Sequence, residues 1–75
     1  MPKLKSLPAK KLIKIIEKLG FKFLRQRGSH ATFFSQDGRM VVIPVHSGKK
    51  IDRGLLLKII KKELGITRDA FEELI

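Results

Sequence analysis

The hydrophobic pattern of this chain changes its period twice, and this change limits the possible folds more than any other feature. Up to Leu19 the apolar residues recur at the spacing of one side of an α-helix. From Phe21 to Val45 the pattern resembles short strands, and from Asp52 it is helical again. This order predicts a helix, a group of strands and a second helix, packed in layers around one core.

The first helix is predicted to be amphipathic. Its apolar side holds Ala9, Leu12, Ile13, Ile16 and Leu19, with Ile15 at the margin. Lysines and Glu17 fall on the opposite side. Ser6 is expected to cap the start, Pro8 suits the first turn, and Gly20 stands where a left-handed residue ends a helix.

Three strands are predicted between the helices, at residues 21–27, 30–35 and 40–45. A Gly28-Ser29 turn joins the first two, and a second turn signal at residues 36–39 joins the last two. Because both connections are short, we expect a three-stranded antiparallel meander.

The second helix is expected from about Asp52, a candidate N-cap, to Leu64, with Gly65 as its stop. Its core stripe is Leu56, Ile59, Ile60 and Leu64, with Leu55 and Leu57 at either edge. At about 100° per residue the apolar arc spans roughly 200°, so part of it is expected to contact a partner. Thr67 is a candidate cap for a last short helix that carries Ala70, Phe71, Leu74 and Ile75.

These elements predict an α+β fold in the order α-β-β-β-α with a short C-terminal helix. Both long helices are expected on one face of the three-stranded antiparallel sheet, with the other face open to solvent.

The 75 residues include no cysteine and two histidines, which excludes disulfides and thiolate metal sites and disfavours other metal centres. No metal or other cofactor is expected.

The net charge of +10 is concentrated in the first half of the chain. Residues 1–30 hold nine lysines and arginines against Glu17 alone, a net charge of +8; residues 31–50 add +2, and residues 51–75 carry five charges of each sign. Such an excess attracts a polyanion, either nucleic acid or an anionic membrane surface. The membrane is disfavoured, because the first helix lacks aromatic anchors and needs its apolar side for the core. A cytoplasmic location is expected, since the sequence shows neither a signal peptide nor a membrane-spanning run.

His30 is the first candidate for chemistry. In the second strand, Ala31 and Phe33 share one face while His30, Thr32 and Phe34 share the other. If Phe33 enters the core, His30 points to the open face. Histidine titrates near neutral pH and can donate or accept a proton, as general acid–base catalysis requires. The alternative is a surface or partly buried strand histidine without a catalytic role.

His46 follows the same alternation. Val41, Ile43 and Val45 fit inward, which sends His46 to the same open face. His46 is a candidate second acid or base, or a side chain that only hydrogen-bonds its own loop. Spacing does not fix the cross-strand register that would decide between these roles.

Several cationic residues are candidates for holding phosphate, arginine by paired hydrogen bonds and lysine as a mobile point charge. The candidate RNA-binding residues are Arg25, Arg27, Ser29, Lys49, Lys50, Lys10 and Lys14. Ordinary solvated surface is the alternative for each charged member of the set. A serine hydrolase is disfavoured, because no Ser-His-Asp arrangement is evident.

Several motifs also occur together in a characteristic order. They are Gly20-Phe21, Arg25 with Gly28-Ser29-His30 and Phe33, Asp37-Gly38, Pro44-Val45-His46-Ser47-Gly48-Lys49, and Gly54 at the entry to the second helix. With these residues the chain resembles HicA-type toxins, the small ribonuclease half of bacterial or archaeal toxin–antitoxin pairs. The ordered set covers most of the chain and is much more specific than any single motif.

The resemblance implies a single domain over residues 1–75 with a fold like that of double-stranded-RNA-binding domains. It also implies metal-independent cleavage of mRNA, a catalytic histidine at His30, and inhibition by a HicB-type antitoxin. The chain departs from the family at Leu55 and Leu57, where polar residues are common. The alternative function is a non-catalytic module that binds structured RNA by shape and phosphate contacts.

Overall fold

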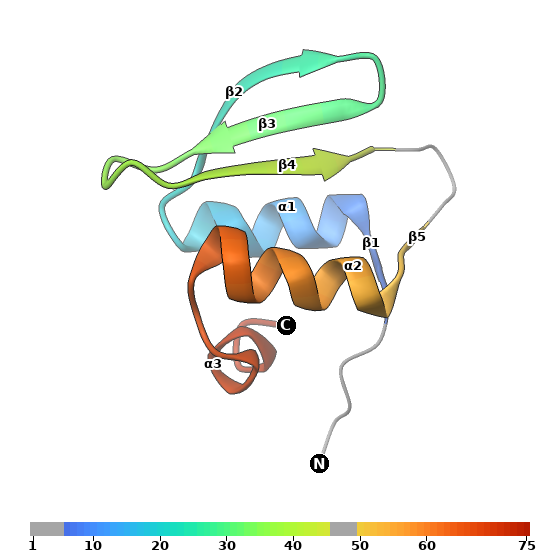
Figure 1. Cartoon of the computed structure of the whole chain (residues 1–75), viewed down its shortest axis with the longest axis vertical. Coiled ribbons are helices and arrows are strands. Elements are labelled where there is room, and N and C mark those ends of the chain that lie inside the picture. The colour runs from blue at the N-terminus through green and yellow to red at the C-terminus, as the bar shows by residue number, and fades with distance from the viewer. Residues whose placement is uncertain (1–5, 46–49) are drawn as a thin grey trace.

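The computed structural model describes residues 6–45 and 50–75. A three-stranded antiparallel sheet lies over the helices, which cover one of its faces (Figure 1). Strands β2 (Lys22–Arg27), β3 (His30–Phe34) and β4 (Met40–Pro44) are neighbours in that order. The predicted α+β fold with its antiparallel meander is therefore confirmed.

Helix α1 (Ala9–Lys18) begins two residues later than an N-cap at Ser6 would require. Its N-cap is Pro8, which is extended and makes no side-chain capping hydrogen bond. The predicted Ser6 cap is wrong, because Leu7 and Pro8 form a short strand between Ser6 and the helix. The Ser6 hydroxyl therefore accepts no hydrogen bond from the first N–H groups of the helix.

The end of α1 matches the prediction. Gly20 adopts a φ of 96°, in the left-handed region that favours glycine. Its N–H donates to the Glu17 carbonyl oxygen at 3.1 Å, and the Phe21 N–H donates to the Ile16 carbonyl oxygen at 3.0 Å. These two bonds form a Schellman cap. The chain thereby reverses at once, and Phe21 enters the core.

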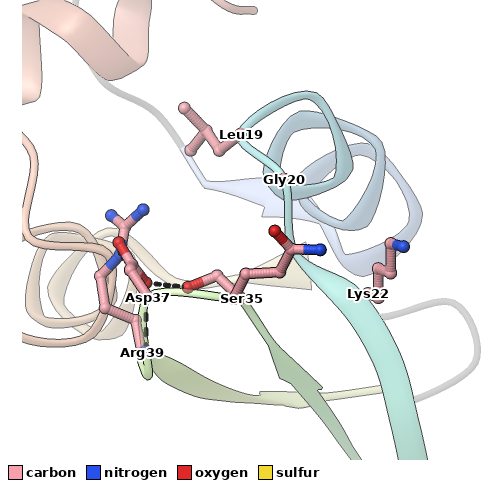
Figure 2. A pocket seen from close by; sticks show the side chains of 7 residues that line it. Leu19, Gly20, Lys22, Ser35, Asp37 and Arg39 are labelled. Carbon is pink, nitrogen blue, oxygen red and sulfur yellow. Dashed lines mark hydrogen bonds and ion pairs between the residues drawn. The ribbon is translucent and has the colours of Figure 1, made fainter.

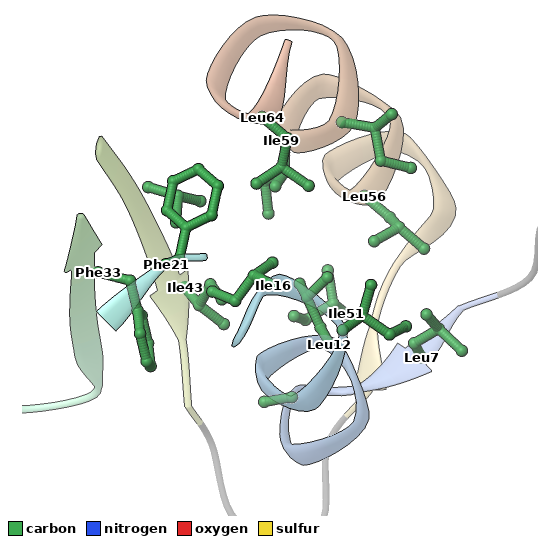
Figure 3. Packing of buried hydrophobic residues seen from close by; sticks show 14 of the residues in the cluster. Leu7, Leu12, Ile16, Phe21, Phe33, Ile43, Ile51, Leu56, Ile59 and Leu64 are labelled. Carbon is green, nitrogen blue, oxygen red and sulfur yellow. The ribbon is translucent and has the colours of Figure 1, made fainter. Parts of the chain in front are cut away.

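A second, two-stranded sheet was not predicted. Strand β1 (Leu7–Pro8) pairs antiparallel with β5 (Lys50–Ile51), with Leu7 opposite Ile51. Both apolar side chains are buried, near Leu12 of α1 (Figure 3). Strands of two residues are too short to show an alternating pattern, so sequence periodicity does not detect them.

The second helix has two parts, α2 (Arg53–Lys58) and the π-helix η1 (Ile59–Leu64). Asp52 is confirmed as the N-cap, since its Oδ1 accepts a hydrogen bond from the Leu55 N–H at 2.8 Å. Gly65 is confirmed as the stop, with a φ of 67°. The wider π winding was not predicted, and it is rare outside single turns.

Helix α3 (Arg68–Glu72) covers part of the second helix. Its cap is confirmed, because Thr67 Oγ1 accepts a hydrogen bond from the Ala70 N–H at 3.1 Å. Phe71 is fully buried and α3 contacts η1, whereas Ala70 and Ile75 are exposed. Leu55 and Leu57, which widen the apolar arc of the second helix, are partly buried against the core.

The core lies between the helices and the inner face of the sheet (Figure 3). Its largest fully buried side chains are Phe21, Phe71, Leu12, Ile16, Ile43, Leu56, Ile59, Ile60, Leu64 and Val41. All four residues of the predicted stripe on the second helix are among them. None of the helices in the described ranges combines the length and the apolar character that a membrane span requires.

The three strands of the main sheet are not equally buried. In β3 and β4 burial alternates, and the inward residues are Ala31, Phe33, Val41 and Ile43. All six residues of β2 are exposed. Figure 1 shows the reason, since β2 is the strand farthest from the helices.

Candidate nucleic-acid interface

A tight hairpin places His30 at the start of the central strand. Arg27 pairs with His30, so the loop consists of Gly28 and Ser29 alone. Gly28 has a φ of 55°, as a two-residue turn with glycine first requires. The Gln26 side-chain amide donates to the Gly28 carbonyl oxygen at 3.0 Å, which ties the turn to its strand.

The same turn is held from the opposite side by β4. The Val45 N–H donates to the Ser29 carbonyl oxygen at 2.6 Å, just beyond the last ladder pair of His30 with Pro44. Ser29 is half-buried at this point. His30 is therefore fixed by backbone bonds on both sides, while its own side chain is exposed.

Cross-strand pairing brings two of the predicted cationic residues to the open face with His30. Arg27 is directly opposite His30, and Arg25 is opposite Thr32 in a neighbouring pair. Directly paired residues point to the same face of a sheet, with their Cβ atoms about 5 Å apart. The inward burial of Ala31 and Phe33 confirms that this face is the solvent-facing one.

The remaining predicted RNA-binding residues are elsewhere. Lys10 and Lys14 are exposed on α1, in the layer beneath the sheet, and Lys50 lies in β5 opposite Pro8. The structure does not bring these lysines onto the open face with His30. His46 and Lys49 lie outside the described residues.

A cluster around Arg39 was missed by the sequence analysis. Arg39 Nε binds Asp37 at 2.9 Å, and the Ser35 hydroxyl donates to the same carboxylate (Figure 2). The Arg39 guanidinium also donates to the Leu64 carbonyl oxygen and lies 5.0 Å from the centre of the Phe21 ring. Hydrogen bonds from Ser35 and then Arg39 lower the pKa of Asp37 to about 2.

The Arg39 cluster borders a cavity of about 430 Å³, which Leu19, Gly20, Lys22 and Gln36 also line (Figure 2). This cavity is at the β3–β4 turn, the opposite end of β3 from His30. Asp37 and Arg39 bind each other, and Arg39 also binds the end of η1, so these two charged groups stabilise the fold. The Asp-x-Arg spacing after a strand was the available signal in the sequence.

The His30 end of the open face has the groups that proton transfer next to a phosphate requires. An exposed imidazole can take or give a proton, and guanidinium groups bind phosphate oxygens by charge-assisted hydrogen bonds. No group of three or more potential metal ligands occurs within residues 6–45 and 50–75. The arrangement therefore fits chemistry on a nucleic-acid backbone.

A comparison with protein-family models finds a match. The model of the family described as the HicA toxin of bacterial toxin–antitoxin systems matches residues 9–66. This region runs from the first residue of α1 through all strands of the main sheet and the second helix. A comparison with curated individual proteins finds no match.

Proposed function

The chain belongs to the HicA family of bacterial toxins, and we propose that it is an endoribonuclease that cleaves mRNA without a metal ion. The observation that supports this proposal best is the position of His30. The imidazole is exposed on the central strand, in one cross-strand row with Arg27 and next to the row of Arg25. A proton-transfer group thus stands among groups that bind phosphate.

In the proposed reaction His30 takes the proton of a ribose 2′-hydroxyl. The 2′-oxygen attacks the adjacent phosphorus, and the bond from phosphorus to the 5′-oxygen of the next nucleotide breaks. That oxygen receives a proton, either from the imidazolium of His30 or from His46 as a second acid. The products are a 2′,3′-cyclic phosphate and a 5′-hydroxyl.

Arg25 and Arg27 have the complementary role. Negative charge accumulates on the phosphate oxygens as the 2′-oxygen attacks, and fixed guanidinium donors stabilise this charge in the transition state. Both arginines lie on β2, which the neighbouring strand holds in register. Their backbone positions are thus fixed before the substrate arrives, which favours electrostatic stabilisation.

The family implies an antitoxin partner, and we propose a HicB-type antitoxin with an acidic surface that covers the open face. Charge complementarity supports this partner, because the chain carries a net charge of +10. Such a partner would neutralise Arg25 and Arg27 and block access to His30. The cytoplasm is the proposed site of action, since mRNA is present there.

The test uses purified protein, RNA and a chelator, with analysis of the product ends. We expect His30→Ala to lower the cleavage rate by about 10²–10⁴-fold, the usual contribution of a general acid or base. His46→Ala is compared in parallel and shows whether one histidine or two are needed. Circular dichroism checks that both variants fold.

Equal cleavage by His30→Ala would refute the catalytic proposal and favour the non-catalytic RNA-binding module. For that module, Arg25→Ala and Arg27→Ala should each weaken RNA binding and reduce its salt dependence. His30→Ala should then have no effect on the function. The two functions are thus separated by one variant.

A further inference from the structure

The open face of the sheet changes character along β3. At the His30 end it is cationic, but at the other end it is apolar. Leu24 is 45% exposed and Met40 is 50% exposed, on either side of the half-buried Phe34. Large apolar side chains gathered on an exposed face indicate a binding surface.

These three side chains line a cavity of about 270 Å³ together with Ser35, Gly38 and Arg39. We call it the Phe34 pocket. Phe34 pairs with Lys22 of β2 on one side and with Met40 of β4 on the other. An aromatic ring thus lies between a cation and an apolar side chain, on the same face as His30.

We propose that the Phe34 pocket binds one unpaired base of the RNA, which stacks on Phe34 while Lys22 contacts its phosphate. This inference rests on the proposed function and adds a second contact to the same face. At about 3.3 Å per residue, Phe34 lies about 13 Å from His30 along β3. A bound strand would therefore contact the pocket a few nucleotides from the cleaved bond.

The positions of the charges favour a nucleotide over an antitoxin side chain. Lys22, Arg25 and Arg27 follow one another along β2 and face the same side as Phe34 and His30. A row of cations beside an aromatic ring that lines a pocket is the arrangement by which proteins hold single-stranded nucleic acid. An acidic antitoxin would use the cations but has no specific need for an aromatic ring in a pocket.

The pocket also implies a class of substrate. In a duplex each base face is covered by its neighbours, so a side chain can stack only on a base that is splayed out. Single-stranded RNA, or a loop within a folded RNA, is therefore the expected ligand. A duplex would use the cations without filling the pocket.

The experiment measures binding of short single-stranded RNA at several salt concentrations, with His30→Ala in every protein to prevent cleavage. Losing one stacked base should weaken binding about 5- to 150-fold, so this is the effect expected of Phe34→Ala. The slope of log affinity against log salt should not change, because stacking releases no counterions. Lys22→Ala should instead reduce that slope by about 0.7.

Phe23→Ala is the matched control. Phe23 is the same residue type on the same hairpin and is 55% exposed, but it pairs with the inward-facing Phe33 and so lies on the other face. Its replacement should leave RNA affinity unchanged. Phe34→Leu checks the fold, since it keeps apolar bulk and should still lose most of the stacking.

A second readout locates the base. An RNA in which 2-aminopurine replaces one base at a time should show a fluorescence change at one position with Phe34, and this change should vanish with Phe34→Leu. If the Phe34→Ala and Phe34→Leu proteins bind RNA as tightly as the protein that retains Phe34, base binding in the Phe34 pocket is refuted while the nuclease proposal stands.

Two other outcomes also refute the pocket. Loss of antitoxin binding in Phe34→Ala, with RNA binding intact, would assign the patch to the protein partner. A chain with His30 that neither binds nor cleaves single-stranded RNA would refute the pocket and the proposed function together.

Discussion

Strands β2 and β4 are the two outer strands of one sheet, yet they have different surroundings. Phe23, Phe33 and Val41 form one cross-strand row on the inner face. Val41 is 0% exposed and Phe33 is 2% exposed, whereas Phe23 is 55% exposed. The helices pack beneath β4 and β3 but do not cover β2 (Figure 1).

The outer edges of these strands differ as well. On β4, the Val42 N–H donates to Glu63 Oε1 of η1 at 3.0 Å, so a helix side chain satisfies part of the strand edge. The edge of β2 carries the exposed Lys22, Arg25 and Arg27, charges that discourage pairing with another chain. The comparison teaches that β4 anchors the sheet, while β2 leaves all of its side chains exposed.

The largest expected effect contrasts two phenylalanines of the shared row. Phe33→Ala should lower the free energy of unfolding by about 3–5 kcal/mol, because it leaves a cavity in the core. Phe23→Ala should cost only about 1 kcal/mol, mainly the edge-to-face contact with Phe33, whose ring centre is 5.7 Å away. Urea denaturation measures both. Equal losses would mean that β2 is as well anchored as β4.

A smaller effect is expected at the anchored edge. Glu63→Ala should lower the free energy of unfolding by about 1 kcal/mol, because the Val42 N–H loses a charged acceptor at a partly exposed site. Glu63→Gln retains an acceptor oxygen and should lose less. Glu17→Ala on the exposed side of α1 is the control for removing a carboxylate. If the control costs as much as Glu63→Ala, the edge bond adds no stability.

The smallest effect concerns the turn that joins β3 to β4. The folded pKa of Asp37 is lowered from 3.8 to about 2, so its contribution to stability is complete above about pH 4 and is lost as the pH falls through about 2. Asp37→Asn should lower the melting temperature slightly at neutral pH. The difference from the parent should shrink across this acid range, whereas the exposed Glu73→Gln should show no such convergence.

Sequence periodicity was sufficient to predict the layers and the orientation of most residues. The alternation around Phe33 and Val41 assigned the inner face, and it did so because both strands pack on helices. Gly20 and Gly65 were correctly predicted as the ends of the two long helices, and Asp52 as the N-cap of the second. Each of these signals depends on local backbone geometry. Local rules therefore determined most of the fold.

The features that were missed depend on contacts distant in sequence. Ser6 was a plausible cap by local rules, but pairing of Leu7 with Ile51 removed it from the helix. The Arg39 cluster needs the end of η1, 25 residues later in the chain. The sequence named Arg25 and Arg27 only as candidates for holding phosphate, and the β2–β3 register is what places Arg27 opposite His30.

The π winding of η1 makes the contacts of this segment sensitive to the deletion of a residue. An α-helix turns by about 100° per residue and a π-helix by less, so the two windings aim later side chains in different directions. In this winding the Glu63 carboxylate and the Leu64 carbonyl oxygen both reach β4 and its turn. Deleting one residue from this segment would restore ordinary helical pitch and rotate both groups away together. The two hydrogen bonds that join η1 to β4 and its turn therefore depend on the number of residues in η1.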